Sequence, residues 1–227
     1  MSTLKDYRDE RLRKLAELKE LGFNPYPAKA HRTHMTNDAV ERFSELENQE
    51  VTVAGRIVSI RKFGKIAFVV VKDASGQVQL FLRSGEVTET NGAKNLVGIE
   101  NLALLDSGDF VEGTGAVIKT QTGEISVGVT KLRLLTKALR PLPSEQEGFT
   151  NKEERLRRRY VDLAVNKEVR ERFVRRSKFW QATREFFDSE GFIEINTPVL
   201  EHTTGGADAN PFVTHMDALD QEFYLRI

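Results

Sequence analysis

Cysteine is missing from the 227 residues, and so is any long apolar run. The absence of cysteine excludes disulfides, thiolate metal sites, zinc ribbons and cysteine nucleophiles together. No apolar stretch approaches the roughly 18 residues that a membrane helix needs. The first residues, Met1 to Asp6, lack the apolar core of a signal peptide. With 39% hydrophobic and 30% charged residues, the composition is typical of a cytoplasmic globular protein of one or two domains.

The chain also has no net charge, but its 34 basic and 34 acidic residues are unevenly spread. Residues 51–140 carry a net charge of +4 and residues 151–180 carry +6, whereas residues 186–227 carry −7. Basic stretches followed by an acidic one are expected if the first part of the chain binds a polyanion. Chance sorting of charges along helices gives the same pattern, so charge alone leaves both explanations open.

Residues 1–48 are predicted to form an N-terminal helical extension. Leucines and a tyrosine recur at helical spacing over residues 3–21, and Gly22 suits the residue after a helix end. Arg8, Arg11 and Lys14 recur along another side of this helix. We expect that basic stripe to be a solvated face, with contact to RNA as the alternative.

Residues 49–143 are predicted to form a five-stranded OB-type barrel. Apolar residues here follow the period of two that is typical of strands, with turns at Gly64 and Gly76. One helix is expected near residues 93–105, between the third and fourth strands. Three strands, a helical insertion and two strands in about 90 residues suit this barrel. The predicted strands cover residues 51–62, 66–71, 77–83, 110–119 and 124–135.

Residues 144–227 are predicted to begin a second, α+β domain after the prolines of the linker, Pro141 and Pro143. A long helix with an apolar stripe is expected over residues 166–190. Strands are expected over residues 192–195, 211–216 and 221–227. The last strand ends the sequence with no element to cover it, so we expect the chain to be part of a longer protein.

The barrel contains the residue types of a surface that binds single-stranded nucleic acid. Phe68 and Phe81 are candidates for stacking on bases, although core packing remains the alternative for both, because apolar neighbours hide the direction of Phe68. Gln79 and Glu124 offer acceptors for base edges. The side chains that could follow the phosphates are Arg56, Arg61, Lys62 and Lys65.

Catalytic signals are weak by comparison. The sequence has no glycine-rich phosphate loop of the Walker or dinucleotide type. Its four histidines lack the spacing of metal ligands, and His202 and His215 are expected to be structural. We therefore name no catalytic residue and no metal ligand.

The segments Gly-Phe-Ile-Glu-Ile-Asn-Thr-Pro at 191–198 and Arg-Tyr-Val-Asp-Leu at 159–163, with several others, resemble the N-terminal part of the bacterial-type lysyl-tRNA synthetases, a family of class II aminoacyl-tRNA synthetases. The first of these segments resembles motif 1 of that class, and the second resembles the entry to its catalytic domain. The segment at 205–215 resembles the lysine-specific branch more than the aspartate and asparagine branches. The remaining similar segments are 64–68, 77–81, 119–126 and 132–143.

The resemblance implies specific roles for several residues. Phe68 matches the aromatic residue that stacks on the central anticodon uracil, and Arg61, Gln79 and Glu124 match polar residues around the lysine anticodon. Gly206 matches a loop position beside the lysine substrate. The implied partners are the anticodon stem-loop of tRNA(Lys) and a second copy of the chain, which docks through motif 1.

The resemblance also implies a reaction, ATP-dependent charging of tRNA with lysine, with Mg²⁺ as the metal of the full-length enzymes. The sequence contains neither the Phe-Arg-x-Glu pattern of motif 2 nor the Gly-x-Gly-x-x-Arg pattern of motif 3. We therefore expect this chain alone to be inactive and to bind neither ATP nor Mg²⁺ well. A non-catalytic module that binds tRNA or single-stranded RNA, or a dimerisation fragment, is the alternative.

Overall fold

The computed structural model describes residues 3–143, 149–203 and 205–227, and it divides into two compact units. The first unit spans Met1–Thr150 and the second spans Asn151–Ile227. Each unit is described by itself. The predicted domain boundary at 143/144 borders residues 144–148, which lie outside the described part.

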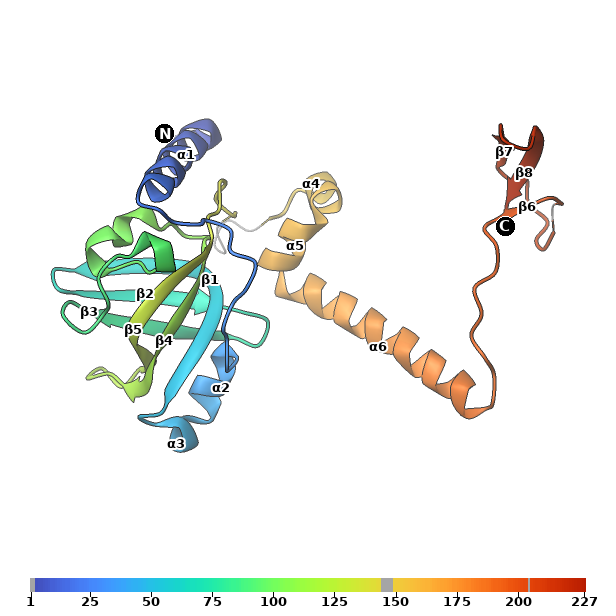
Figure 1. Cartoon of the computed structure of the whole chain (residues 1–227). Coiled ribbons are helices and arrows are strands. Elements are labelled where there is room, and N and C mark those ends of the chain that lie inside the picture. The colour runs from blue at the N-terminus through green and yellow to red at the C-terminus, as the bar shows by residue number, and fades with distance from the viewer. Residues whose placement is uncertain (1–2, 144–148, 204) are drawn as a thin grey trace. The chain divides into compact units, whose positions relative to one another are not determined.

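A closed five-stranded barrel forms the first unit, as the sequence predicted (Figure 1). Neighbouring strands follow the order β1-β2-β3-β5-β4, and β4 pairs back with β1. The β3–β5 pairing is parallel, whereas the other four are antiparallel. The strands are β1 (Glu50–Phe63), β2 (Ile66–Lys72), β3 (Gln77–Arg83), β4 (Phe110–Lys119) and β5 (Ile125–Thr136).

Alternate residues of every strand fill the barrel. Val53, Val69, Leu80 and Leu134 are fully buried, and the residues between them face outward because side chains alternate along a strand. Glycine is required where β4 crosses β5. A Cβ on Gly115 would lie 1.9 Å from the carbonyl oxygen of the facing strand, so any side chain there would push the two strands apart.

The prediction of one helix at residues 93–105 is wrong. Two short 3₁₀ helices occupy this region, η1 (Gly92–Lys94) and η2 (Ile99–Leu104). Asn95 adopts a left-handed conformation with φ of 58° and ends η1, and Gly98 precedes η2. The apolar residues of the segment, such as Leu102, are buried against the barrel, so tertiary packing rather than helix propensity sets its conformation.

Three α-helices precede the barrel strands. Helix α1 (Leu4–Glu20) begins with a capping box between Thr3 and Asp6, and Gly22 follows its end with φ of 86°. The short helices α2 (Thr36–Glu41) and α3 (Phe43–Leu46) follow, and α2 contacts β1, β3 and β5. Hydrogen bonds fix the start of α2, since Asp73 accepts from the amide and hydroxyl of Thr36. Burial acts to raise the pKa of Asp73, but hydrogen bonds from Ser75 and Thr36 outweigh it and lower that pKa to about 2.

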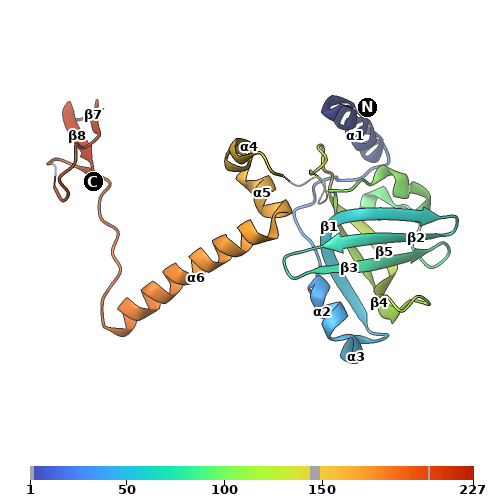
Figure 2. The same cartoon turned by 180° about the vertical axis from the view of Figure 1, so that it is seen from behind.

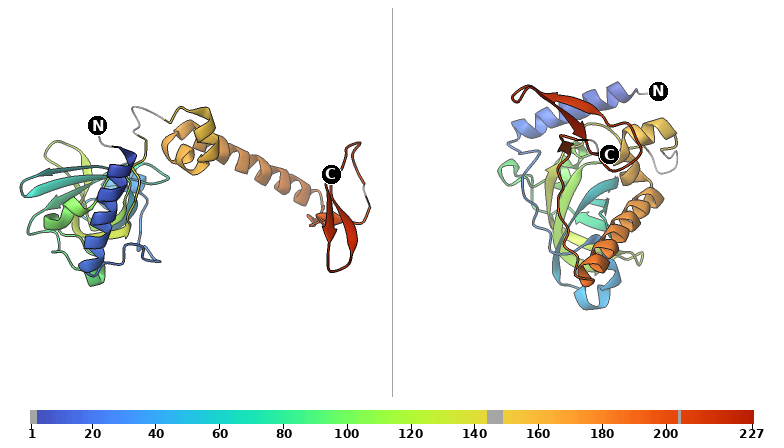
Figure 3. Two further views of the ribbon diagram at one scale, coloured as in Figure 1. Left: turned by 90° about the horizontal axis from the view of Figure 1, so that it is seen from above. Right: turned by 90° about the vertical axis from the view of Figure 1, so that its right-hand side faces the viewer.

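Helix α1 lies beside η2 on the outside of the barrel (Figure 3). The expectation that its basic stripe is solvated is wrong for Arg11, which is only 7% exposed. Its guanidinium donates to the carbonyl oxygens of Ser107 and Ala138 at 2.8 and 3.1 Å. Lys14 forms an ion pair with Asp106 at 2.7 Å. These cations therefore attach the helix to the barrel.

A buried ion cluster completes this attachment. Lys137 is 1% exposed, and its ammonium group donates to Asp109 at 2.8 Å, to Asp106 at 2.5 Å and to the Leu104 carbonyl at 2.9 Å. Burial raises the pKa of Asp109, although the charge of Lys137 opposes that effect. For Asp106, burial acts in the same direction, but hydrogen bonds from Lys137 and Lys14 prevail and its pKa is lowered.

The second unit contains three helices and a small antiparallel sheet. Asp162, whose side chain is fully buried, accepts hydrogen bonds from Arg155 and Asn166 and joins the helices at their ends. The sheet has the order β6-β8-β7. The elements are α4 (Lys152–Arg157), α5 (Arg159–Val165), α6 (Lys167–Ser189), β6 (Leu200–Glu201), β7 (Val213–Met216) and β8 (Gln221–Leu225).

These elements confirm the long helix and the two final strands, but the strand expected at 192–195 is wrong. The segment is extended and pairs with no other segment among the described residues. Ile193 and Ile195 are 86% and 74% exposed. Alternating apolar residues do not form a strand without a neighbour to complete the hydrogen bonds.

Replacing Lys137 with methionine will destabilise the barrel by about 3–5 kcal/mol, because Asp109 is then left buried without its counter-charge. Urea unfolding of the full chain, followed by far-ultraviolet circular dichroism, measures the change. Lys131→Met is the matched control, since Lys131 is an exposed lysine of β5, the strand that Lys137 follows, and its loss should cost under about 0.5 kcal/mol. Equal stability of the two variants would contradict the role given to the ion cluster.

Candidate nucleic-acid interface

The outer face of β1, β2 and β3 brings most of the predicted base-binding residues together. Figure 2 shows these three strands side by side. Arg61 is paired with Phe68 across β1 and β2, and Phe68 is paired with Phe81 across β2 and β3. Directly opposite residues point to the same face of a sheet. The three side chains therefore form one row across the barrel surface.

Burial confirms that this row points outward. Ala67, Leu80 and Leu82 fill the interior, whereas Phe68 and Phe81 are partly exposed. Core packing, the alternative left open for both phenylalanines, is therefore not what the structure shows. The two rings are 5.4 Å apart between centroids with an interplanar angle of 37°. Together they make an open aromatic surface of the kind on which a base can stack.

Arginines border this aromatic pair. The guanidinium carbon of Arg61 lies 6.0 Å from the centroid of Phe68, and that of Arg83 lies 5.2 Å from the centroid of Phe81. Arg83 also forms an exposed ion pair with Glu86 at 2.8 Å. The surface therefore combines ring faces with positive charge, which suits a polyanion with unpaired bases.

Gln79 lies in the next row, where the parallel pairing of β3 and β5 sets it opposite Ser126. Its amide nitrogen donates to the Ser126 hydroxyl at 3.0 Å. This bond orients the amide and leaves its oxygen to accept a hydrogen bond from a ligand.

Glu124 is exposed in the turn that precedes β5. Its backbone is fixed by Thr120, whose amide donates to the Glu124 carbonyl at 2.9 Å and whose hydroxyl accepts from the Glu124 amide at 3.2 Å. Glu124 also lies two residues before Ser126, the partner of Gln79. Barrel closure therefore brings the two predicted base-reading segments to neighbouring positions.

The four basic residues expected to follow phosphates divide into two groups. Lys62 and Lys65 are exposed at the β1–β2 hairpin beside Arg61, and the Lys62 ammonium donates to the Ile99 carbonyl at 2.8 Å. Arg56 lies toward the other end of β1, opposite Lys72. Its guanidinium lies 4.5 Å from the centroid of Phe110, and burial lowers its pKa. Arg56 therefore packs on Phe110, away from Lys62 and Lys65 at the β1–β2 hairpin.

Sequence reasoning missed Phe63 and Arg83, which extend the same face by one row. Phe63 is 61% exposed, and its ring centroid lies 6.3 Å from that of Phe68 at an interplanar angle of 65°. The signal was present in the period of two, because Phe63 follows Arg61 by two positions on one strand.

The predicted lysine-binding residue, Gly206, lies in the second unit, in the loop between β6 and β7. Its φ is 109°, which favours glycine, and a Cβ there would meet no atom within 4 Å among the described residues. The neighbouring Thr204 lies outside the described residues. The ring of His202, an exposed residue, lies 4.4 Å from the ring of Phe223 between centroids.

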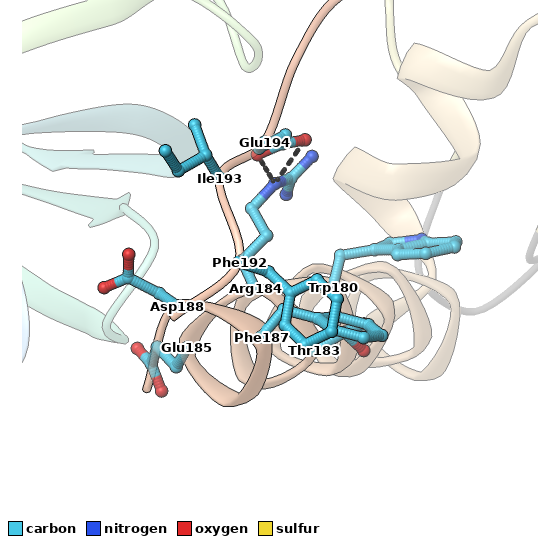
Figure 4. A pocket seen from close by; sticks show the side chains of 9 residues that line it. All are labelled: Trp180, Thr183, Arg184, Glu185, Phe187, Asp188, Phe192, Ile193 and Glu194. Atoms are coloured by element: carbon cyan, nitrogen blue, oxygen red, sulfur yellow. Dashed lines mark hydrogen bonds and ion pairs between the residues drawn. The ribbon is translucent and has the colours of Figure 1, made fainter. Parts of the chain in front are cut away.

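Helix α6 presents a second notable surface. Among its described residues Val169 alone is buried, and the rings of Trp180 and Phe187 are 49% and 47% exposed. Figure 4 shows a groove at the end of this helix, where Arg184 forms an ion pair with Glu194 at 3.0 Å. The groove is lined by Trp180, Thr183, Arg184, Glu185, Phe187, Asp188, Phe192, Ile193 and Glu194.

Two negative findings apply to the part of the chain that the structure describes. That part contains no group of three histidine, aspartate or glutamate side chains placed to hold a metal ion. It also has no helix with the length and apolar content needed to cross a bilayer.

Comparisons with protein families match both units. Residues 51–135 match the OB-fold nucleic acid binding domain, and residues 151–227 match the class II tRNA synthetases for aspartate, lysine and asparagine (D, K and N). The chain therefore joins an OB-fold nucleic-acid-binding domain to a class II synthetase domain, and the predicted fold class is confirmed.

Individual relatives narrow this class. The chain is 44% identical over 220 residues to a lysine–tRNA ligase of Carboxydothermus hydrogenoformans. The aligned region covers 96% of this chain and 43% of the relative. The chain is also 43% identical to lysine–tRNA ligases of Dehalococcoides mccartyi and Fervidobacterium nodosum, over 96% and 99% of this chain. The chain is thus a homologue of the lysine–tRNA ligases, and it spans less than half the length of these relatives.

Proposed function

We propose that the outer face of β1, β2 and β3 binds the anticodon loop of a lysine tRNA. The observation that carries this proposal is the partly exposed pair of Phe68 and Phe81, bordered by Arg61, on the outside of an OB barrel. Partly exposed aromatic rings beside cations are the usual means of binding unpaired bases. As a tRNA-binding protein, the chain is proposed to act in the cytoplasm.

In this proposal, different residues provide base stacking and recognition of the base edges. Phe68 receives the central base of the anticodon, and its ring accepts any base because every base has an aromatic face. Gln79 and Glu124 each supply an acceptor for the N3–H group of a uracil. Their oriented positions support this role, because a base without a matching donor would leave these acceptors desolvated and unpaired. Lys62 and Lys65 attract the phosphates and add no sequence preference.

The larger activity we propose is that of the relatives, ATP-dependent charging of tRNA with lysine. Gly206 is proposed to lie beside the lysine substrate, and its exposed backbone with no neighbouring atom supports that position. The full-length enzymes are proposed to use ATP and Mg²⁺. The described residues offer no cluster of carboxylates for the metal, so we assign neither ATP nor Mg²⁺ to any residue of this chain.

A second copy of the chain is the proposed partner for α6. Its phenylalanines and Trp180 are exposed along the longest helix of the second unit, among the described residues, and the adjoining groove is largely apolar. Exposed apolar surface of this extent marks an interaction site. We propose a homodimer in which this helix and the segment up to Pro198 form the interface.

Phe68→Ala will weaken binding of an anticodon stem-loop by about 1–3 kcal/mol whatever the loop sequence, because a stacking ring is lost. Gln79→Ala and Glu124→Ala will instead reduce the difference in affinity between a UUU loop and one with a changed central base. Fluorescence anisotropy with the full chain measures both effects. Phe68→Trp is the matched control and should retain binding. A folded Phe68→Ala variant that binds like the unmodified chain would contradict the proposal.

The 227-residue chain will catalyse no lysine-dependent exchange between ATP and pyrophosphate. Its sequence lacks the two arginine-containing patterns that would neutralise the triphosphate during adenylate formation. The assay is run beside a full-length lysine–tRNA ligase as a positive control. Exchange above background from a purified sample would overturn this part of the proposal, whereas loop binding without exchange fits a module that only binds tRNA.

Phe187→Glu will reduce self-association of the chain, because it sets a charge in the apolar groove. Sedimentation velocity over a range of concentrations measures the shift toward monomer. Lys178→Glu is the control, since Lys178 lies nine positions earlier, on the opposite side of the helix from Phe187. If the unmodified chain is a monomer at all concentrations, the proposed dimer is wrong for this chain.

A further inference from the structure

Phe63 is the most exposed ring of the barrel's aromatic surface. It ends β1 immediately before the turn at Gly64, whose φ is 56°, and 61% of its surface is accessible. Burying a phenylalanine side chain normally gains about 1.5–3 kcal/mol, and this ring gains little of that in the chain by itself. An exposed ring that borders other rings on a charged face is a candidate for ligand contact.

The position of Phe63 relative to Phe68 is specific. The two residues lie one row apart on neighbouring strands, with 6.3 Å between ring centroids. Stacked bases are spaced about 3.4 Å apart along a strand, so a base between two parallel rings needs a separation of roughly twice that value. The observed separation is close to this requirement, and the rings differ from it mainly in their 65° angle.

Phe63 is also free to change that angle. In contrast to Phe68, which has Phe81 at 5.4 Å on its other side, it contacts a single ring among the described residues. Rotation about the side-chain bonds of an exposed residue is fast and costs little. The stacking pair of Phe68 and Phe81 is therefore the fixed part of the surface, and Phe63 is the part that can adjust to a ligand.

We propose that Phe63 closes over the base that stacks on Phe68, so that one unpaired base is held between two rings. The proposal rests on the anticodon-binding function proposed above and adds a residue to it. The hairpin that carries Phe63 also carries the exposed Lys62 and Lys65. Lys62 pairs with the buried Ala67 and donates to the Ile99 carbonyl, so its ammonium lies on the other side of the strand from Phe63. The hairpin therefore carries both the ring and positive charge that can attract phosphates.

A purely structural role for Phe63 predicts different behaviour. If the ring only stabilised the hairpin by its contact with Phe68, its loss would lower the melting temperature and weaken every ligand alike. A ring that encloses a base instead contributes only when that base is present. The two roles therefore differ in whether the loss of affinity caused by removing the ring depends on the presence of the base.

The test measures binding of the full chain to anticodon stem-loops that carry UUU, with an abasic nucleotide at the central position or at either flanking position. Phe63→Ala should weaken binding of the intact loop by at least about 5-fold, the lower limit for loss of one stacking contact. It should have no further effect on the loop whose central base is missing. Phe63→Leu, which retains an apolar side chain without a ring, should behave like Phe63→Ala.

Two controls make the result decisive. Lys62→Ala changes the same hairpin without removing a ring, and its effect should be equal for intact and abasic loops. Phe68→Ala should weaken binding of the intact loop and have little effect on the loop that lacks the central base. The enclosure is wrong, and the proposed function stands, if the effect of Phe68→Ala depends on the central base but that of Phe63→Ala does not. The same conclusion follows if the effect of Phe63→Ala depends on a flanking base instead. If the unmodified chain does not distinguish an intact loop from an abasic one, the proposed function itself fails.

Discussion

The parallel pairing of β3 with β5 closes the barrel, and the candidate interface depends on that closure. Gln79, Leu80 and Phe81 pair with residues 126–128, which come from a segment more than forty positions later. At Gly115 the backbone of β4 lies close to Gly128, one of these paired residues of β5, and leaves no room for a side chain. Without this closure, Gln79 would lose its hydrogen bond to Ser126, and the turn at Glu124 would lie far from the aromatic rings.

A second constraint fixes what surrounds the barrel. Lys137 is buried at the end of β5 and is bonded to two aspartates and a carbonyl oxygen of the η2 region. One of these aspartates also pairs with Lys14 of α1. A buried charge needs compensation from several directions, so this lysine joins the first helix, the 3₁₀ segment and the strand end. Arg11 and Lys14 of α1 therefore stabilise the fold, and the cations beside the aromatic pair are Arg61 of β1 and Arg83 of β3.

The two units differ in how much of their apolar surface they bury. The first unit buries its valines and leucines inside the barrel and leaves a few rings open on one face. In the second unit, α6 leaves most of its aromatic residues exposed, although Asp162 and its hydrogen bonds fix the start of the helix. The apolar surface of the second unit is thus concentrated on α6, whereas that of the first is inside the barrel.

The sequence by itself determined the five barrel strands, the long helix and the OB class, because periods of two and 3.6 are local properties of the chain. It named Phe81 as a candidate for stacking but left core packing open for it, and the pairing of β3 with β2 and β5 decided that the ring faces outward. The sequence could not orient Phe68, which lies within six consecutive apolar residues, and only pairing with Arg61 and Phe81 showed that the ring faces outward. The same holds for the stacking of Arg56 on Phe110, the burial of Arg11 and the 3₁₀ turns at 92–104. In each case contacts between distant segments, rather than local preference, decide where the side chain lies.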